Sequence, residues 1–398
     1  MRYSFLLLCL SQIGLFPVES VCQHRVIHSE IDGVPLVRTE GGPKYSGPLI
    51  ELESDLILGV DEGEPEWQLF YRTPRILVAP DGTIILVDIQ RFEIFFVSDE
   101  GELLARQGGS GAGPGEFRDI LDAFWADVGQ EIWLTDQLNA RITRYNLGGD
   151  LLGSFSYGGI RSRYQHYSSL GNGSFLATGT IYKGPDLINR VLEFAIVNQD
   201  LERTVLLHEY QNPGRFMVSE NRVDSAPYHL SDSARAFPDG RILLSQPQTP
   251  RLTVYSNQGE IQFHIERDWE EQPVTGEEKR RIRNMWRSAG LSEAASRIPF
   301  PDRKPFFSSA FTDSEGRIWL QRYVAPEDRV DDEGQITFTS EYEIYSREGV
   351  WLGTQPLDHI PRVITGEYVY CSYLSEEGPR FERLRIIPKV PELKPEGI

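Results

Sequence analysis

Cysteine and histidine are scarce in this sequence of 398 residues, and no hydrophobic run is long. The chain has 3 cysteines and 7 histidines, and neither type forms the closely spaced pairs that are typical of a zinc site. No stretch reaches the roughly 20 apolar residues that a membrane-spanning helix needs. We therefore expect neither a cysteine-based zinc site nor a transmembrane segment.

The short motifs of several enzyme classes are also missing. The sequence contains no Gly-x-Ser-x-Gly elbow and no His-Glu-x-x-His pair. The glycine-rich segment 108–117 lacks the Lys-Ser or Lys-Thr of a phosphate-binding loop. His229, Asp232 and Ser233 have the residue types of a catalytic triad, but neighbouring strand positions face opposite ways, so we interpret this grouping as accidental. The sequence therefore favours a protein without catalytic activity.

Positive charge is also in short supply. The chain has 40 Lys and Arg against 59 Asp and Glu, which gives a formal net charge of −19 at pH 7. Such a field repels phosphate backbones, so we expect no nucleic-acid partner. One local basic cluster interrupts the acidic sequence, formed by Lys279, Arg280, Arg281, Arg283 and Arg287.

What the sequence does contain is a pattern that returns six times: a short apolar run, a turn with glycine, and a second apolar run. Segments such as Val78–Leu86 and Ala236–Leu244 are typical of a β-hairpin. Successive turns lie about 45 to 75 residues apart, and the shorter spacings match one four-stranded propeller blade. Six such units predict an all-β, six-bladed β-propeller. The turn glycines are Gly82, Gly129, Gly173, Gly240, Gly316 and Gly366.

The clearest repeats, from Arg75 to Phe155, resemble the NHL-repeat family of six-bladed β-propellers. Within them, residues 92–117 read as a strand, a polar turn, a second strand and a glycine-rich blade junction. The resemblance continues more weakly to about Pro388. It implies the fold but no single activity, because such propellers include enzymes, receptors and scaffolds. A propeller closes when an N-terminal strand joins the last blade, and we assign that role to Leu49–Leu58.

The first 20 residues are predicted to be a signal peptide, because the apolar stretch Phe5–Phe16 follows Arg2 and is too short to span a bilayer. We expect the protein to be periplasmic or secreted, and monomeric. The remaining chain is predicted to comprise an N-terminal extension at 21–48, the propeller at 49–390 and a tail at 391–398.

Two cysteines, Cys22 and Cys371, remain after removal of the signal peptide. In an exported protein they could form a disulfide that ties the N-terminal segment to the last blade. In the alternatives, Cys371 is a core residue and Cys22 is free or carries a lipid anchor. Lipid attachment is less favoured, because the residues before Cys22 depart from a bacterial lipobox.

One segment, at about 275–297, interrupts the β pattern between the fourth and fifth blades, and we predict a helical insertion there. Thr275 and Glu278 have the spacing of a capping box. We interpret the insertion as a helix packed on the propeller. The alternatives are a lid over the channel mouth and a contact for an acidic partner. Its apolar stripe is predicted to contain Ile282, Met285, Trp286 and Ala289.

Candidate binding residues follow from the repeat alignment, because the first strand of each blade lines the central channel. In the fourth blade, Arg235 lies two residues after Ser233 and therefore on the same face of the strand. Polar groups that converge at a concave mouth form the default ligand site, although a one-residue slip in the alignment would reverse the face. Seven positions before each turn glycine the residue is polar, which gives the ring Arg75, Asp122, His166, Ser233, Ser309 and His359.

We favour an exported, non-catalytic propeller that binds a small molecule, a glycan or a protein at this ring and needs no cofactor. The alternative is a propeller enzyme similar to the metal-dependent lyases or the lactonases of related families. It would hold a divalent ion through Asp122, His166 and His359. A third possibility is a scaffold that binds a partner protein through the helical insertion.

Overall fold

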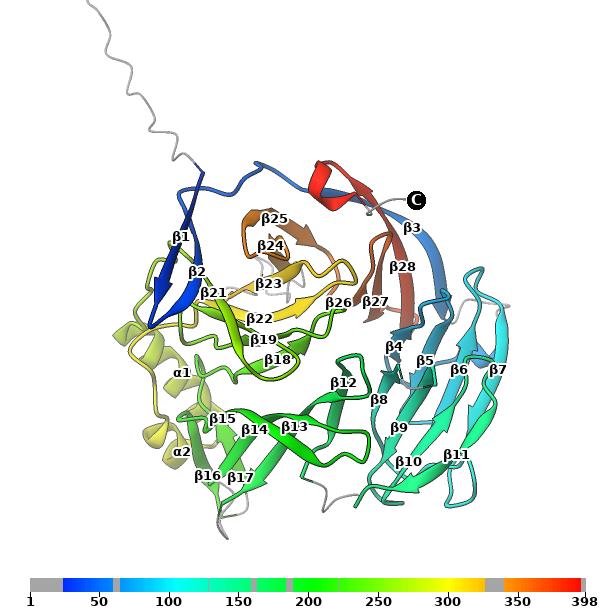
Figure 1. Ribbon diagram of the computed structural model, residues 1–398. Helices are drawn as coiled ribbons and strands as arrows, with labels where there is room; N and C mark the ends of the chain where they lie inside the picture. Colours follow the sequence, from blue (N-terminus) through cyan, green and yellow to red (C-terminus); the bar gives the residue numbers. More distant parts are fainter. Residues whose placement is uncertain are drawn as a thin grey trace, which may run out of the picture.

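The structure is a computed structural model in which β-strands form six sheets around a central axis (Figure 1). This arrangement confirms the six-bladed β-propeller predicted from the sequence. The predicted signal peptide and Cys22 lie outside the described residues. Those residues are 24–59, 65–127, 129–158, 163–183, 189–220, 222–325 and 340–394.

The first two blades are four-stranded antiparallel sheets whose first strand lies innermost (Figure 1). A short 3-10 helix at Glu66–Gln68 precedes them. Blade one contains β4 to β7, at Arg75–Val78, Ile84–Asp88, Glu93–Val97 and Leu103–Gly108. Blade two contains β8 to β11, at Ile120–Ala126, Glu131–Asp136, Arg141–Tyr145 and Leu151–Ser156.

Blades three and four repeat this order, and the fourth is enlarged by two further strands. Blade three contains β12 to β15, at His166–Ser169, Phe175–Tyr182, Arg190–Val197 and Arg203–Tyr210. Blade four contains β18 to β21, at Ser233–Ala236, Ile242–Ser245, Leu252–Tyr255 and Ile261–Arg267.

Blades five and six complete the ring, and the last one takes its outer strand from the N-terminal part of the chain. β3 (Ile50–Gly59) pairs antiparallel with β28, from Ile50 opposite Pro388 to Gly59 opposite Arg380. Blade five contains β22 to β25, at Phe307–Thr312, Ile318–Arg322, Ser340–Tyr345 and Trp351–Leu357. Blade six contains β26 to β28, at Pro361–Ile364, Tyr368–Leu374 and Pro379–Pro388.

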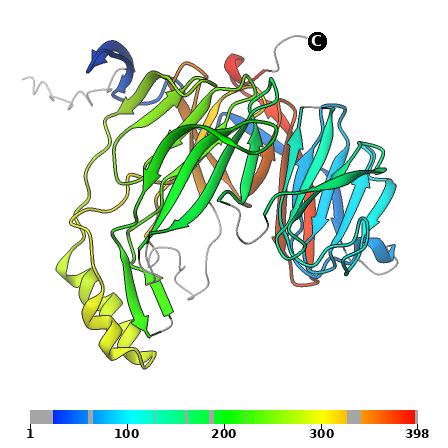
Figure 2. The ribbon, with the colours of Figure 1, turned by 60° about the horizontal axis from the view of Figure 1, so that its bottom comes forward.

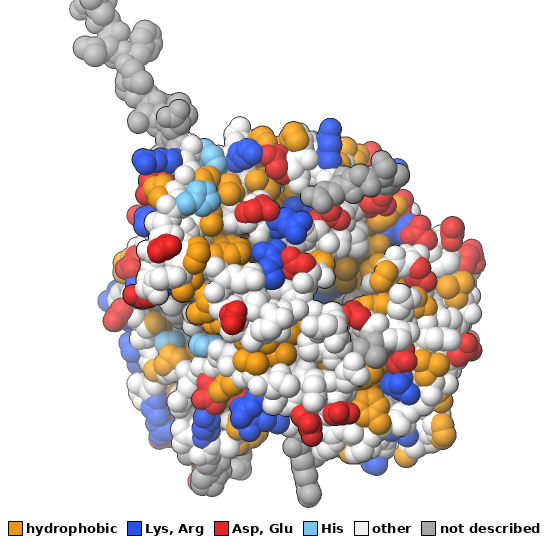
Figure 3. Space-filling view, viewed as in Figure 1, with side chains coloured by type: hydrophobic (Ala, Val, Ile, Leu, Met, Phe, Trp, Pro, Cys, Tyr) orange, Lys and Arg blue, Asp and Glu red, His pale blue; other side chains and the backbone are white. Residues whose placement is uncertain are grey.

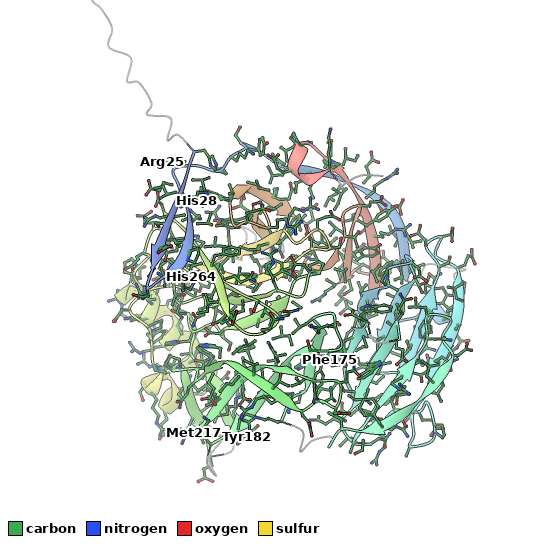
Figure 4. The ribbon with its side chains drawn as sticks, in the orientation of Figure 1. Arg25, His28, Phe175, Tyr182, Met217 and His264 are labelled. Carbon is green, nitrogen blue, oxygen red and sulfur yellow. The ribbon has the colours of Figure 1, made fainter. Side chains whose placement is uncertain are left out.

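The predicted N-terminal extension is part of the folded ring, which the sequence did not indicate. Its strands β1 (Arg25–Ile31) and β2 (Val34–Glu40) form a hairpin. β2 pairs in parallel with β21, which makes the fourth blade a six-stranded sheet. Figure 4 shows Arg25 and His28 on this hairpin at the outer edge of the molecule. At the other end, a 3-10 helix at Pro391–Leu393 buries Leu393 in the core, so the predicted tail is also partly packed.

The helical insertion contains two helices, α1 (Gly276–Ser288) and α2 (Ser292–Arg297). The capping box is confirmed, because the Glu278 N–H donates to the Thr275 hydroxyl and the Thr275 N–H donates to the Glu278 carboxylate. The predicted apolar stripe is only half right. Ile282 is buried and Trp286 is partly buried, whereas Met285 is 61% exposed and Ala289 is exposed.

The two helices pack on a hairpin that the sequence analysis missed. This hairpin, β16 (Arg215–Ser219) and β17 (Arg222–Ser225), lies between blades three and four in the chain. The ring of Phe216 lies 5.4 Å from that of Trp286. Figures 1 and 2 place the helices at the outer edge of the ring, away from its middle, as expected for a packed decoration rather than a lid.

The repeated sequence pattern produces the blades through their turns and their faces. Five of the six turn glycines, all except Gly366, have φ between 75° and 89°, a backbone region that strains any residue with a Cβ. The apolar runs on either side form a buried cluster between each pair of neighbouring blades. Phe124, Trp133 and Phe175, for example, pack against one another between blades two and three.

A buried carboxylate stabilises blade three. Glu193 in β14 has no exposed side-chain surface and accepts hydrogen bonds from Arg163, Arg203 and the Tyr164 hydroxyl. Burial alone would raise its pKa, but these bonds and the two guanidinium charges outweigh that effect and lower the pKa to about 2. Because the native pKa is depressed, the stabilisation is complete above about pH 4.5 and is lost as the pH falls towards 2.

We therefore expect Glu193→Gln to lower the free energy of unfolding by about 1.5–3 kcal/mol at pH 7, the range for hydrogen bonds to charged groups. Urea denaturation between pH 7 and pH 2.5 measures the difference from wild type, which should shrink as the pH falls through this window. Glu209→Gln, at an exposed ion pair with Lys183, is the matched control and should cost less than about 1 kcal/mol. A difference that stayed constant with pH would contradict the assignment.

Candidate functional site

The six residues of the predicted ring occupy equivalent places, one in each blade. Arg75, His166 and Ser233 begin the inner strands β4, β12 and β18. Asp122 and Ser309 lie near the start of β8 and β22, and His359 lies two residues before β26. The inner strands surround the middle of the ring (Figure 1). Figure 3 shows a hollow near the middle of the face in view.

Three members of this ring contact one another across blades one, two and three. The Arg75 Nη1 donates to the Asp122 Oδ1 at 3.1 Å. The other carboxylate oxygen accepts the backbone N–H of Tyr167 at 3.0 Å and lies 3.5 Å from the His166 Nδ1. Both oxygens of Asp122 therefore have a partner, and its side chain is only 14% exposed. His166 remains accessible, with 51% of its side chain exposed.

The other members of the ring are satisfied within their own blades. The Ser233 and Ser309 hydroxyls and the His359 imidazole contact residues of their own blades rather than one another. The six polar residues therefore do not form one continuous hydrogen-bonded network. The partners are Ser245 Oγ for Ser233 at 2.8 Å, Gln321 Oε1 for Ser309 at 3.1 Å, and the Tyr373 ring for His359, stacked at 3.8 Å.

This geometry does not assemble the metal ligands of the alternative hypothesis. Among the residues that the structure describes, no group of three or more His, Cys, Asp or Glu side chains is placed to hold a metal ion. Asp122 and His166 are neighbours, but His359 does not join them and stacks on Tyr373 in the last blade. The metal hypothesis stays a prediction that this arrangement does not support.

Arg235 lies in β18, the inner strand of blade four, and its side chain is exposed. Its Nη1 donates to the carbonyl of Ala234 at 3.0 Å. Desolvation by the surrounding protein lowers its pKa below the usual arginine value. Arg235 is not among the residues that line the cavity described below, so its role in ligand binding stays a prediction.

The residues that resemble a triad in the sequence are not assembled as one. Asp232 accepts hydrogen bonds from the His208 Nε2 at 2.7 Å and from Gln246 at 3.1 Å. Ser233 bonds to its own blade, and burial lowers the pKa of His229. Asp232 and Ser233 thus have separate hydrogen-bond partners, and neither partner is His229.

Cys371 belongs to the apolar cluster between blades five and six and is almost fully buried. Burial raises the pKa of its thiol to about 12, which makes it a poor nucleophile at neutral pH. Its predicted disulfide partner, Cys22, lies outside the described residues, so the pairing stays a prediction.

A cavity of about 450 Å³ opens where the inner strands of blades six, one and two meet. It includes Arg75 and Asp122, which the sequence analysis named. It also includes Arg72, in the loop before β4, and Arg362 of β26, which that analysis missed because neither occupies a repeated ring position. The other lining residues are Thr73, Pro74, Ile76, Leu77, Ile89, Ala123 and Ser372.

Within the described part of the chain, no helix has both the length and the apolar character needed to cross a membrane. No protein-family model and no curated protein matches the sequence. The similarities below are therefore similarities of structure.

Several solved structures share the architecture at low sequence identity. One is a Bacteroides fragilis protein inferred to be exported, with a TM-score of 0.52 and 9% identity over 89% of this chain and 100% of that one. A DUF4221-family protein of Bacteroides vulgatus matches at a TM-score of 0.49 and 12% identity, covering 85% and 99%. Virginiamycin B lyase from Staphylococcus aureus matches at 0.40 and 11%, covering 85% and 100%. At these identities the likeness concerns the fold alone, and this chain has the fold of a six-bladed β-propeller.

Proposed function

We propose that this protein is an exported, non-catalytic β-propeller that binds a small molecule, a glycan or a segment of a protein at the mouth of its central channel. The observation that carries the proposal is the cavity between blades six, one and two. Its volume of about 450 Å³ falls in the range of ligand pockets, and it combines apolar walls with a few converging polar groups. Both ends of the Arg75–Asp122 pair line it.

The chemistry of the cavity favours binding over catalysis. Asp122 is paired with Arg75 and with the Tyr167 N–H, so it is poorly placed to accept a proton from a substrate. The remaining charged groups of the lining are arginines, which are permanently protonated. Export and the relation to NHL-repeat propellers are part of the proposal and rest on the sequence patterns alone.

Elemental analysis of the purified mature protein separates this proposal from the metal-dependent enzyme. We expect no stoichiometric divalent ion before chelation, and no change in thermal stability when a chelator is added. One tightly held ion per chain, lost in Asp122→Ala, His166→Ala and His359→Ala, would overturn the proposal and favour a lyase-like or lactonase-like enzyme.

A substitution at the rim tests the cavity directly. Thr73 lies in the loop before β4 and lines the cavity, so Thr73→Trp should occupy its mouth without disturbing a strand. A thermal-shift screen of mono- and disaccharides, sugar acids and short peptides measures binding, because a ligand that binds only the native state raises Tm. We expect compounds that raise the Tm of wild type to have no effect on Thr73→Trp.

The matched control for this screen is Thr204→Trp. Thr204 is exposed on β15, the outer strand of blade three, far from the inner strands that line the cavity. It should leave every Tm shift as in wild type. A ligand whose effect survives Thr73→Trp binds elsewhere and contradicts the proposed location.

A further inference from the structure

We propose that the channel-mouth cavity recognises an oxyanion, so that its ligand is a small organic molecule with a carboxylate, phosphate or sulfate group. The guanidinium groups of Arg72 and Arg362 would hold this group beside the Arg75–Asp122 pair. The inference rests on the proposed function, because it names the class of ligand for the same cavity.

The charged groups that line the cavity favour an anionic ligand. Among its described lining residues are three arginines and a single acidic residue, Asp122. That carboxylate is already committed to Arg75, at 3.1 Å, and to the Tyr167 N–H. Among the residues that the structure describes, neither Arg72 nor Arg362 has a carboxylate partner within 4 Å. Within the described part of the chain, these two guanidinium groups of the cavity therefore have no counter-charge.

This excess is notable because the protein as a whole is acidic. With 59 acidic against 40 basic residues, many arginines have a carboxylate partner, exposed ones included. Arg106 pairs with Glu93, Arg303 with Glu271, and Arg322 with Glu341. A concave site with low-dielectric walls concentrates the field of such unneutralised charges and attracts anions.

Buried polar residues position the Arg362 guanidinium and the loop that carries Arg72. The Arg362 Nε donates to the Ser372 hydroxyl at 3.2 Å, and Ser372 is 4% exposed. The two terminal nitrogens of Arg362 have no hydrogen-bond partner among the described residues, so they can act as a fork for two oxygen atoms. Asp88, which is 1% exposed, accepts the backbone N–H of Tyr71 at 3.2 Å and so anchors the loop that carries Arg72.

The apolar part of the lining indicates that the ligand is more than a bare ion. Pro74, Ile76, Leu77, Ile89 and Ala123 form walls next to the arginines. A volume of about 450 Å³ exceeds what a single phosphate or sulfate ion fills. A sugar acid, a sugar phosphate or an aromatic carboxylic acid would satisfy both parts of the cavity, with its anionic group on the arginines and its body on the walls.

Matched pairs of probes that differ only in charge test the proposal. D-Glucuronate and D-glucose 6-phosphate are each compared with D-glucose, and benzoate with benzyl alcohol, by isothermal titration calorimetry. We expect at least one charged probe to bind wild type roughly tenfold or more tightly than its neutral partner. Tenfold is about the smallest gain in affinity expected from one hydrogen bond to a charged group. The relative affinities of the carboxylates and the phosphate then show which oxyanion the cavity prefers.

Three variants locate the binding. Arg72→Gln and Arg362→Gln remove a charge from exposed side chains, and each should weaken the charged probe roughly tenfold or more. The matched control is Arg25→Gln, at an exposed arginine on the outer hairpin (Figure 4), which should bind as wild type does. Unchanged unfolding temperatures of all three variants confirm that the fold is intact.

The outcomes separate the two proposals. If D-glucose or benzyl alcohol binds as tightly as its charged partner and Thr73→Trp abolishes that binding, the channel-mouth site stands and the oxyanion inference is wrong. If no charged probe binds more tightly than about 1 mM, or if Arg25→Gln weakens binding as much as Arg72→Gln does, the inference is also overturned. If binding of every probe survives Thr73→Trp, both proposals fail.

Discussion

A ring of sheets holds together only if its first and last members are joined, and here the joint is the antiparallel pairing of β3 with β28. Each blade buries both faces against its neighbours, so an open ring would expose two apolar faces to water. The clusters between blades six and one and between blades five and six both include residues of the joined sheet, such as Phe381 and Ile50. The position of every inner strand, and hence of the channel, depends on this closure.

Closure has a direct consequence for the candidate site. Arg362 belongs to the last blade, Arg72 and Arg75 to the first, and Asp122 to the second. The cavity therefore exists only in the closed ring, because its walls come from blades that are far apart in the chain and meet at the joint. A ligand that bridges these blades would stabilise the closed state by its own binding free energy. A ligand in this cavity would therefore contact the blades that meet where the ring closes.

The insertions show how the regular ring tolerates additions at its outer edge. The β1–β2 hairpin extends blade four through parallel pairing of β2 with β21, and β16–β17 with α1 and α2 forms a separate apolar cluster. Neither addition pairs with an inner strand, because β2 joins the outer strand β21 and β16–β17 is a separate sheet. The basic helix α1 keeps its charges at the periphery, where Arg283 lies 5.0 Å from the ring of Phe300. These elements add surface without altering the channel.

The sequence by itself determined the repeated hairpins, the closing strand at 49–58 and the capped helix at Thr275, because turn chemistry and apolar alternation act over a few residues. The repeat positions also placed Arg75 and Asp122 at equivalent points of two neighbouring inner strands, where they form an ion pair. Only the tertiary structure decided that His359 stacks on Tyr373 and that the extension at 25–40 joins blade four. It likewise decided that Arg72 and Arg362 share a cavity. These facts depend on contacts between segments far apart in the chain, for which local patterns carry no signal.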